Sequence, residues 1–173
     1  MVLLVLDQSD GEQTAVVAMA AEYCEVDHIT FMARKARGLV SLALTEERCE
    51  QLNLPPMVDP ATSGAVKLSI EASTGIETGI SAADRARTVQ VAVAPDAKPS
   101  DLVQPGHIFP VATLTGGVLI RTGAAEAGVD LATLAGLTPA AVFAEVLDES
   151  GDLANAAALV DFADQHDITV GRV

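Results

Sequence analysis

The chain has 173 residues, of which 50% are hydrophobic, and it carries a formal net charge of −14. Nucleic-acid binding depends on Lys and Arg side chains that neutralise phosphates, so this charge argues against a nucleic-acid partner. Every apolar run is shorter than the roughly 20 residues that cross a bilayer, and no basic segment precedes an apolar one near Met1, so we expect a cytoplasmic protein without a membrane span.

The N-terminal part of the chain predicts a strand followed by a helix. Residues 1–6 form a continuous apolar run, which indicates a buried strand that ends at Asp7. The apolar stretch 15–21 is ambiguous between strand and helix. Further on, Asp27 is expected to cap a helix that ends at Gly38.

Turn-forming segments separate the remaining predicted elements. Thr45 and Ser81 are each followed by acidic residues in the next turn, so both are expected to cap helices. Alternating apolar residues predict a half-buried strand at 66–70. The stretch 95–110 is rich in Pro, Asp and Gly and is interpreted as an ordered surface connection. The other predicted elements are strands at 39–44, 141–147 and 168–170 and helices at 45–52, 81–94, 123–134 and 153–166.

These elements interleave strands and helices without strict alternation, and no internal repeat is visible. The pattern predicts an α/β (α+β) fold, with a mixed sheet flanked by helices. The length favours a single domain over residues 1–173.

Carboxylates gather in one loop after the first predicted strand. Asp7, Asp10 and Glu12 are oxygen ligands of the kind that hold magnesium, and each can also serve as a general base. A solvated acidic turn is the alternative interpretation of the same three residues.

Two further segments have the composition of an anion or acid–base site. Thr78 and Ser81 open a predicted helix, whose free N–H groups and neighbouring hydroxyls suit a phosphate, although an ordinary helix cap with Asp84 explains them as well. His107 lies in a loop between two prolines, which is rigid enough to aim an imidazole, and a structural histidine is the alternative.

Three charged residues in the second half, Arg121, Glu126 and Glu145, are also candidates. Arg121 suits bidentate phosphate binding. Glu145 lies near the end of a predicted buried strand, where a carboxylate is costly unless it is paired or used. The chain contains no Walker loop and no dinucleotide fingerprint.

Three motifs together resemble the 3,4-dihydroxy-2-butanone 4-phosphate synthase family, the riboflavin-pathway lyases. They are TGISAADRART at 78–88, GHIFP at 106–110 and GGVLIRTGAAEAGVDL at 116–131. The resemblance implies an α/β sandwich that forms a homodimer, with active sites at the subunit interface. It also implies a small-molecule substrate: the family converts ribulose 5-phosphate into dihydroxybutanone phosphate and formate with a divalent metal ion.

The resemblance assigns roles residue by residue. Asp7, Glu12, His107 and Glu145 match catalytic positions, with Glu12 at a metal-ligand position. Arg121 matches the phosphate-binding arginine, and Thr78 and Ser81 fall in the substrate-binding segment. The family motif Arg-x-Gly-His-Thr-Glu-Ala reads Arg-Thr-Gly-Ala-Ala-Glu-Ala at 121–127, so Ala124 replaces the second metal ligand.

Ala125 replaces the neighbouring threonine, and Gly11, Thr14 and Val16 replace charged residues of the family's acidic loop. These departures together lead us to rank three functions. The first is a diverged lyase or isomerase that acts on a related polyhydroxylated or phosphorylated substrate, with no cofactor or with weakly bound magnesium. The second is a non-catalytic homologue that binds a small molecule or partners an intact synthase. The third is the standard riboflavin-pathway synthase.

Overall fold

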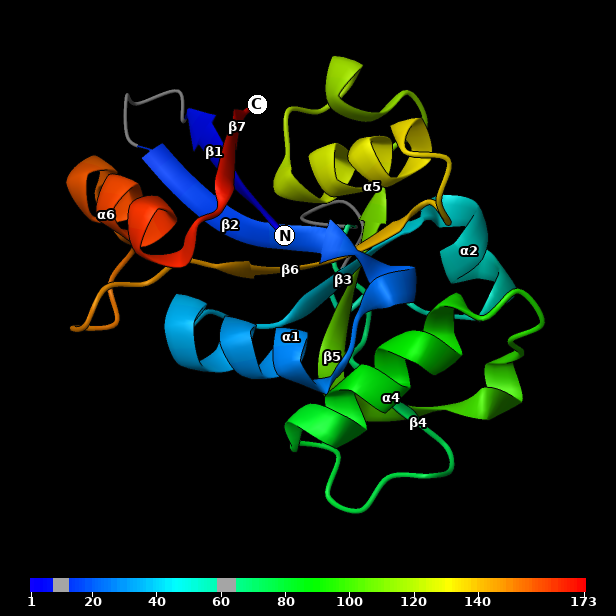
Figure 1. Ribbon diagram of the computed structural model, residues 1–173. Coiled ribbons are helices and arrows are strands. Elements are labelled where there is room, and N and C mark those ends of the chain that lie inside the picture. Colours follow the sequence, from blue (N-terminus) through cyan, green and yellow to red (C-terminus); the bar gives the residue numbers. More distant parts are fainter. Residues whose placement is uncertain (8–12, 59–64) are drawn as a thin grey trace.

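The computed structural model describes residues 1–7, 13–58 and 65–173. Their strands form one seven-stranded mixed sheet in the order β4-β5-β3-β6-β2-β1-β7 (Figure 1). Two strand pairs are parallel, β3 with β5 and β1 with β7, and the others are antiparallel. The strands are β1 Val2–Asp7, β2 Gln13–Ala20, β3 Ser41–Thr45, β4 Ile70–Ala72, β5 Leu102–Thr113, β6 Ala140–Glu145 and β7 Thr169–Arg172.

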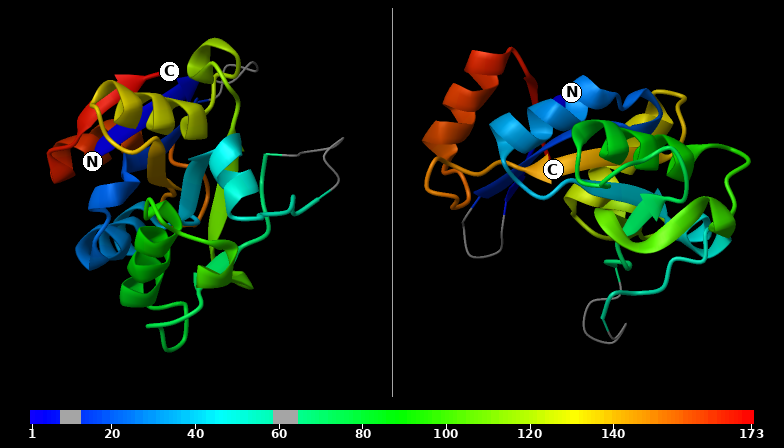
Figure 2. Two further views of the ribbon diagram at one scale, coloured as in Figure 1. Left: turned by 90° about the vertical axis from the view of Figure 1, so that its right-hand side faces the viewer. Right: turned by 90° about the horizontal axis from the view of Figure 1, so that it is seen from below.

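Helices cover both faces of this sheet, which confirms the predicted fold class (Figures 1 and 2). The larger apolar cluster joins the sheet to α1, α4 and α6, and the smaller one joins the other face to α5. No helix of the described residues is long and apolar enough to cross a membrane. The helices are α1 Val26–Phe31, α2 Glu46–Gln51, α4 Ala82–Val93, α5 Ala124–Leu134, α6 Ala156–His166, the π-helical turn η2 Met32–Ala36 and the 3-10 turns η1 Ala21–Tyr23, η3 Pro99–Asp101 and η4 Gly117–Leu119.

Local capping chemistry explains where several helices begin. The side chains of Thr45 and Ser81 accept hydrogen bonds from the third residue of α2 and α4, as predicted. The prediction for the first helix was wrong at both ends. Glu25 is its capping residue instead of Asp27, and the left-handed residue at its end is Arg37, with φ 68°, instead of Gly38.

Two predictions about the middle of the chain were also wrong. The stretch 95–110 is no surface connection, because a 12-residue strand, β5, begins inside it at Leu102. Pro105 lacks an N–H, but it lies beside a register irregularity of the β4–β5 pair, where a ladder hydrogen bond is not required. The alternating segment 66–70 pairs only through isolated bridges until Ile70, where β4 begins.

Candidate functional site

Three polar side chains lie on the face of the sheet that α5 covers. Val111 and Phe143 pack with α5, and side chains alternate between faces along a strand. His107 precedes Val111 by four residues and Glu145 follows Phe143 by two, so both belong to the same face. Ser41 of β3 lies between their strands and pairs with Phe143. The sheet therefore brings His107, Ser41 and Glu145 together on adjacent strands.

The end of β6 that carries Glu145 is held by the segment after the π-helical turn. The Gly38 N–H donates to the Glu145 carbonyl at 3.1 Å, and the Leu147 N–H donates to the Ala36 carbonyl at 2.8 Å. A Cβ atom on Gly38 would lie 2.2 Å from the Glu145 carbonyl oxygen. Glycine is therefore required at position 38 for close backbone contact, which helps to position Glu145.

His107 has a carboxylate partner that the sequence analysis did not identify. Its Nδ1 atom contacts the Oε1 atom of Glu71, which comes from the neighbouring strand β4. The side chain of Glu71 is 16% exposed and that of His107 is 42% exposed. The imidazole is thus anchored at one nitrogen and remains accessible to a substrate.

The loop before α4 is organised around Asp84. Its carboxylate accepts hydrogen bonds from the N–H groups of Glu77, Thr78 and Gly79 and from the Thr78 hydroxyl, at 3.0–3.3 Å. Ser81 Oγ accepts the Asp84 N–H at 3.0 Å. Burial alone pushes the pKa of the Asp84 carboxyl upward, but these contacts outweigh it and lower the pKa. The N–H and hydroxyl of Thr78 therefore point to Asp84, and the substrate-binding roles of Thr78 and Ser81 stay predictions.

Arg121 lies just before α5 and is paired with a buried acid. Its Nε donates to Glu126 Oε1 at 2.8 Å, and its Nη2 contacts the same oxygen and the Ala112 carbonyl. Glu126 is 1% exposed and also accepts the Leu114 N–H at 3.2 Å. Arg121 keeps a side-chain exposure of 36%. The Nη1 group makes no hydrogen bond to a described residue, so it is the part of this guanidinium that remains for an anion.

The predicted acidic and metal-binding residues are only partly within the described chain. Asp7 ends β1 and accepts a hydrogen bond from the Gln13 amide at 2.7 Å. Asp10 and Glu12 lie outside the described residues. Ala124, the first residue of α5, has no ligand atom. Over residues 1–7, 13–58 and 65–173, no group of three His, Cys, Asp or Glu side chains could hold a metal ion. These residues do not form a magnesium site by themselves.

Neither cysteine provides a nucleophile for this site. Cys24 and Cys49 are free thiols that are almost completely buried. Burial raises the pKa of each thiol to about 12. Both side chains therefore contribute to the apolar core.

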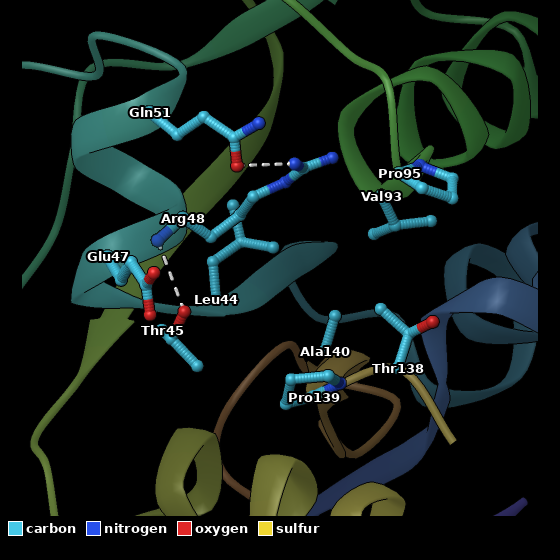
Figure 3. A pocket seen from close by; sticks show the side chains of 10 residues that line it. All are labelled: Leu44, Thr45, Glu47, Arg48, Gln51, Val93, Pro95, Thr138, Pro139 and Ala140. Atoms are coloured by element: carbon cyan, nitrogen blue, oxygen red, sulfur yellow. Dashed lines mark hydrogen bonds between the residues drawn. The ribbon is translucent and has the colours of Figure 1, made fainter.

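Two hollows lie at the other end of β3, near Thr45. One has a volume of about 240 Å³ and the other of about 620 Å³, and both include Thr45 in their lining. In the smaller one, Arg48 lies against Gln51 and extends toward Val93 and Pro95 (Figure 3). The Nε group of Arg48 donates to the Ala92 carbonyl near the end of α4, so this arginine caps the C-terminal end of that helix.

The geometry and the motifs agree with one known family. The sequence profile of 3,4-dihydroxy-2-butanone 4-phosphate synthase matches residues 1–173. The chain belongs to this family. A synthase of that name from Pseudomonas syringae is 53% identical over 100% of the chain, and the riboflavin biosynthesis protein RibBA of Aquifex aeolicus is 47% identical over 97%. The chain covers 47% and 43% of these two proteins, so it spans about half of their length.

Solved structures of synthases have the same fold. The two-domain synthase RibBX from A. baumannii is 50% identical, with a TM-score of 0.90, and the match covers 99% of this chain and 51% of that one. A synthase in complex with two magnesium ions is 35% identical, with a TM-score of 0.87, and the match covers 99% of this chain and 86% of that one. The fold class predicted from the sequence is therefore that of the synthases.

These relatives contradict the function that we ranked first. A chain that shares 53% of its residues with a named synthase over its entire length supports the standard riboflavin-pathway enzyme, which we ranked third. The departures from the family pattern, at Ala124, Ala125, Gly11, Thr14 and Val16, were given too much weight against agreement along the whole chain. Glu71 was not predicted from the sequence, although it lies in an alternating stretch where a lone carboxylate between buried neighbours is a usable signal.

Proposed function

We propose that this chain converts ribulose 5-phosphate into 3,4-dihydroxy-2-butanone 4-phosphate and formate. The observation that carries this proposal is the 53% identity to a named synthase over the whole chain. The grouping of His107, Ser41 and Glu145 on the α5 face supports it, because rearrangement of a sugar phosphate requires several proton transfers at adjacent carbons and oxygens.

In this proposal His107 and Glu145 exchange protons with the sugar. His107 is anchored through Nδ1, so its Nε2 atom is available for proton transfer. Glu145 is partly exposed at the end of β6, where its carboxylate can act as a second acid–base group. Arg121 contributes its Nη1 group to the phosphate, while its other nitrogens hold the arginine in place.

We infer that magnesium binds weakly in the absence of substrate. Magnesium is commonly held by one or two carboxylates together with oxygens of the substrate, and it polarises those oxygens when bound. The described residues offer no complete set of ligands. Glu12 stays the predicted protein ligand.

We also propose a cytoplasmic homodimer with the site near the subunit interface. Its support is an apolar surface on α5 and the segment before it, with side chains that are 45–90% exposed in the chain alone. This α5 apolar surface consists of Leu114, Leu119, Ile120, Leu131 and Leu134.

Proton NMR of the purified chain with ribulose 5-phosphate and magnesium tests the proposed reaction. We expect a formate signal that grows with time, together with the four-carbon product. The Glu145→Gln variant tests the role of Glu145 in the same assay. We expect it to reduce the rate of formate release on the order of 100-fold or more. Unchanged substrate in the presence of folded wild-type chain would refute the reaction, whereas wild-type rates in Glu145→Gln would refute only the role of Glu145.

A further inference from the structure

The strongest unassigned feature of the site is the contact between His107 and Glu71. These residues come from β5 and β4, which pair antiparallel, and Nδ1 of the imidazole contacts Oε1 of the carboxylate. We propose that Glu71 is a positioning residue that fixes the orientation and tautomer of His107, so that Nε2 faces the substrate. This inference rests on the proposed function, because His107 is the acid–base group that it orients.

The surrounding backbone leaves space for Glu71. A Cβ atom on Gly79 would lie 1.7 Å from Glu71 Oε1. Gly79 also has a φ of 77°, a backbone conformation that residues other than glycine rarely adopt. The loop that carries Gly79 is held by the Asp84 carboxylate, which accepts the Gly79 N–H at 3.0 Å. The glycine thus removes the one atom that would exclude the carboxylate from its position beside His107.

The strand before His107 is held as well. The Gly106 N–H donates to the Ser69 hydroxyl at 3.1 Å, one residue before the imidazole. With its backbone fixed there and its Nδ1 atom on Glu71, the ring has little freedom to turn. The His107 side chain is nevertheless 42% exposed, so the ring is held in place without being covered.

The chemistry of imidazole explains why this contact affects proton transfer. A neutral ring carries one proton, and a carboxylate at Nδ1 accepts an N–H there, which leaves the lone pair on Nε2. When Nε2 takes a proton from the sugar, the ring becomes a cation that the Glu71 carboxylate stabilises. A neutral amide at position 71 can keep a hydrogen bond but lacks this charge.

Nitrogen-15 NMR of the histidine rings tests the tautomer in the intact chain. The chain has three histidines, and His28 provides an internal reference, because its Nδ1 accepts the Glu25 N–H at 3.0 Å and the proton must be on Nε2. We expect the neutral His107 to carry its proton on Nδ1, opposite to His28. The His107→Gln variant identifies the signal. A neutral His107 with its proton on Nε2 would overturn the proposal.

Steady-state kinetics provide the second measurement. Glu71→Gln should lower kcat on the order of 100-fold with little change in KM, because it affects proton transfer rather than phosphate binding. Glu50→Gln, at an exposed position on α2, is the matched control and should keep wild-type kcat. An unchanged kcat in Glu71→Gln would overturn the positioning role. If the wild-type chain forms no formate, the proposed reaction fails but the NMR measurement still decides the role of Glu71.

Discussion

The guanidinium of Arg121 is fixed by the buried carboxylate of Glu126, which lies in the first turn of α5. Glu126 also accepts a hydrogen bond from the Leu114 N–H. Its carboxylate therefore holds the start of the segment 114–126, which carries Arg121, against the first turn of α5. Acidic side chains in the first turn are favoured by the helix dipole. The guanidinium of Arg121 is therefore held in one orientation, and its Nη1 group makes no hydrogen bond to a described residue.

Replacement of Glu126 by Gln should destabilise the chain. The variant keeps the volume but removes the charge opposite Arg121, and it leaves buried donors without a strong acceptor. We expect the free energy of unfolding to fall by about 1–3 kcal/mol in urea denaturation. Glu149→Gln, at an exposed position in the turn after β6, is the control and should have no measurable effect. Equal stability of the two variants would contradict a structural role for Glu126.

Asp84 should make the stability of the chain depend on acid pH. Its pKa is held below the ordinary value of 3.8, so its contribution to stability is complete above that value and is lost as the pH falls through the folded-state pKa. Asp84→Asn should lower Tm most at pH values above 3.8, and the difference from wild type should shrink below it. Thermal unfolding followed by circular dichroism across this range measures the trend. A Tm difference that grows toward acid pH would contradict the assignment.

Gly38→Ala should reduce both stability and activity. Its Cβ atom would overlap the Glu145 carbonyl and displace the end of β6, which we expect to cost about 1–3 kcal/mol. Gly171→Ala is the matched control, since its nearest neighbour is the flexible Leu4 side chain at 3.3 Å. Urea denaturation measures the first effect and formate release the second. Wild-type values for Gly38→Ala would show that the close contact does not position Glu145.

Leu119→Asp should weaken the proposed dimer. Leu119 is 90% exposed in the α5 apolar surface, and a charge there opposes its burial between subunits. We expect the dissociation constant from analytical ultracentrifugation to rise on the order of tenfold or more. Val160→Asp, on the exposed side of α6, is the control and should leave association unchanged. A wild-type chain that is monomeric at all concentrations would contradict the dimer itself.

Mn²⁺, which can replace magnesium in oxygen-rich sites, tests the weak metal site. Because Ala124 supplies no ligand atom where the family has a metal-binding histidine, we expect that the chain alone does not bind micromolar Mn²⁺ stoichiometrically in an electron paramagnetic resonance titration. Addition of ribulose 5-phosphate should increase binding, since its oxygens complete the coordination. One tightly bound equivalent without substrate would contradict this expectation.

The fold was largely predictable from local patterns. The apolar run of β1 and the capping residues Thr45 and Ser81 act over a few residues, so the sequence alone indicates them. β5 was missed because its prolines argue against a strand locally, whereas pairing with β3 through residues 109–113 stabilises it. Such long-range pairing leaves little trace in composition.

The site was less predictable than the fold. His107, Arg121, Glu126 and Glu145 were candidates from the sequence, but the contacts of His107 with Glu71 and of Arg121 with Glu126 depend on which strands and turns meet in space. Gly38 was recognised as a helix end, although close contact with β6 explains it. The reaction was misjudged because several departures from the family pattern, Ala124 among them, were visible in the motifs, while the extent of agreement of the whole chain with named synthases was not.

The most direct test compares formate release by the wild-type chain and by Ala124→His, each with ribulose 5-phosphate and magnesium. We predict that the wild-type chain releases one formate per sugar consumed, so that Ala124 does not prevent the family reaction. The variant should change the rate or the magnesium requirement without creating the activity. Formate from the variant and none from the wild-type chain would contradict the proposed function.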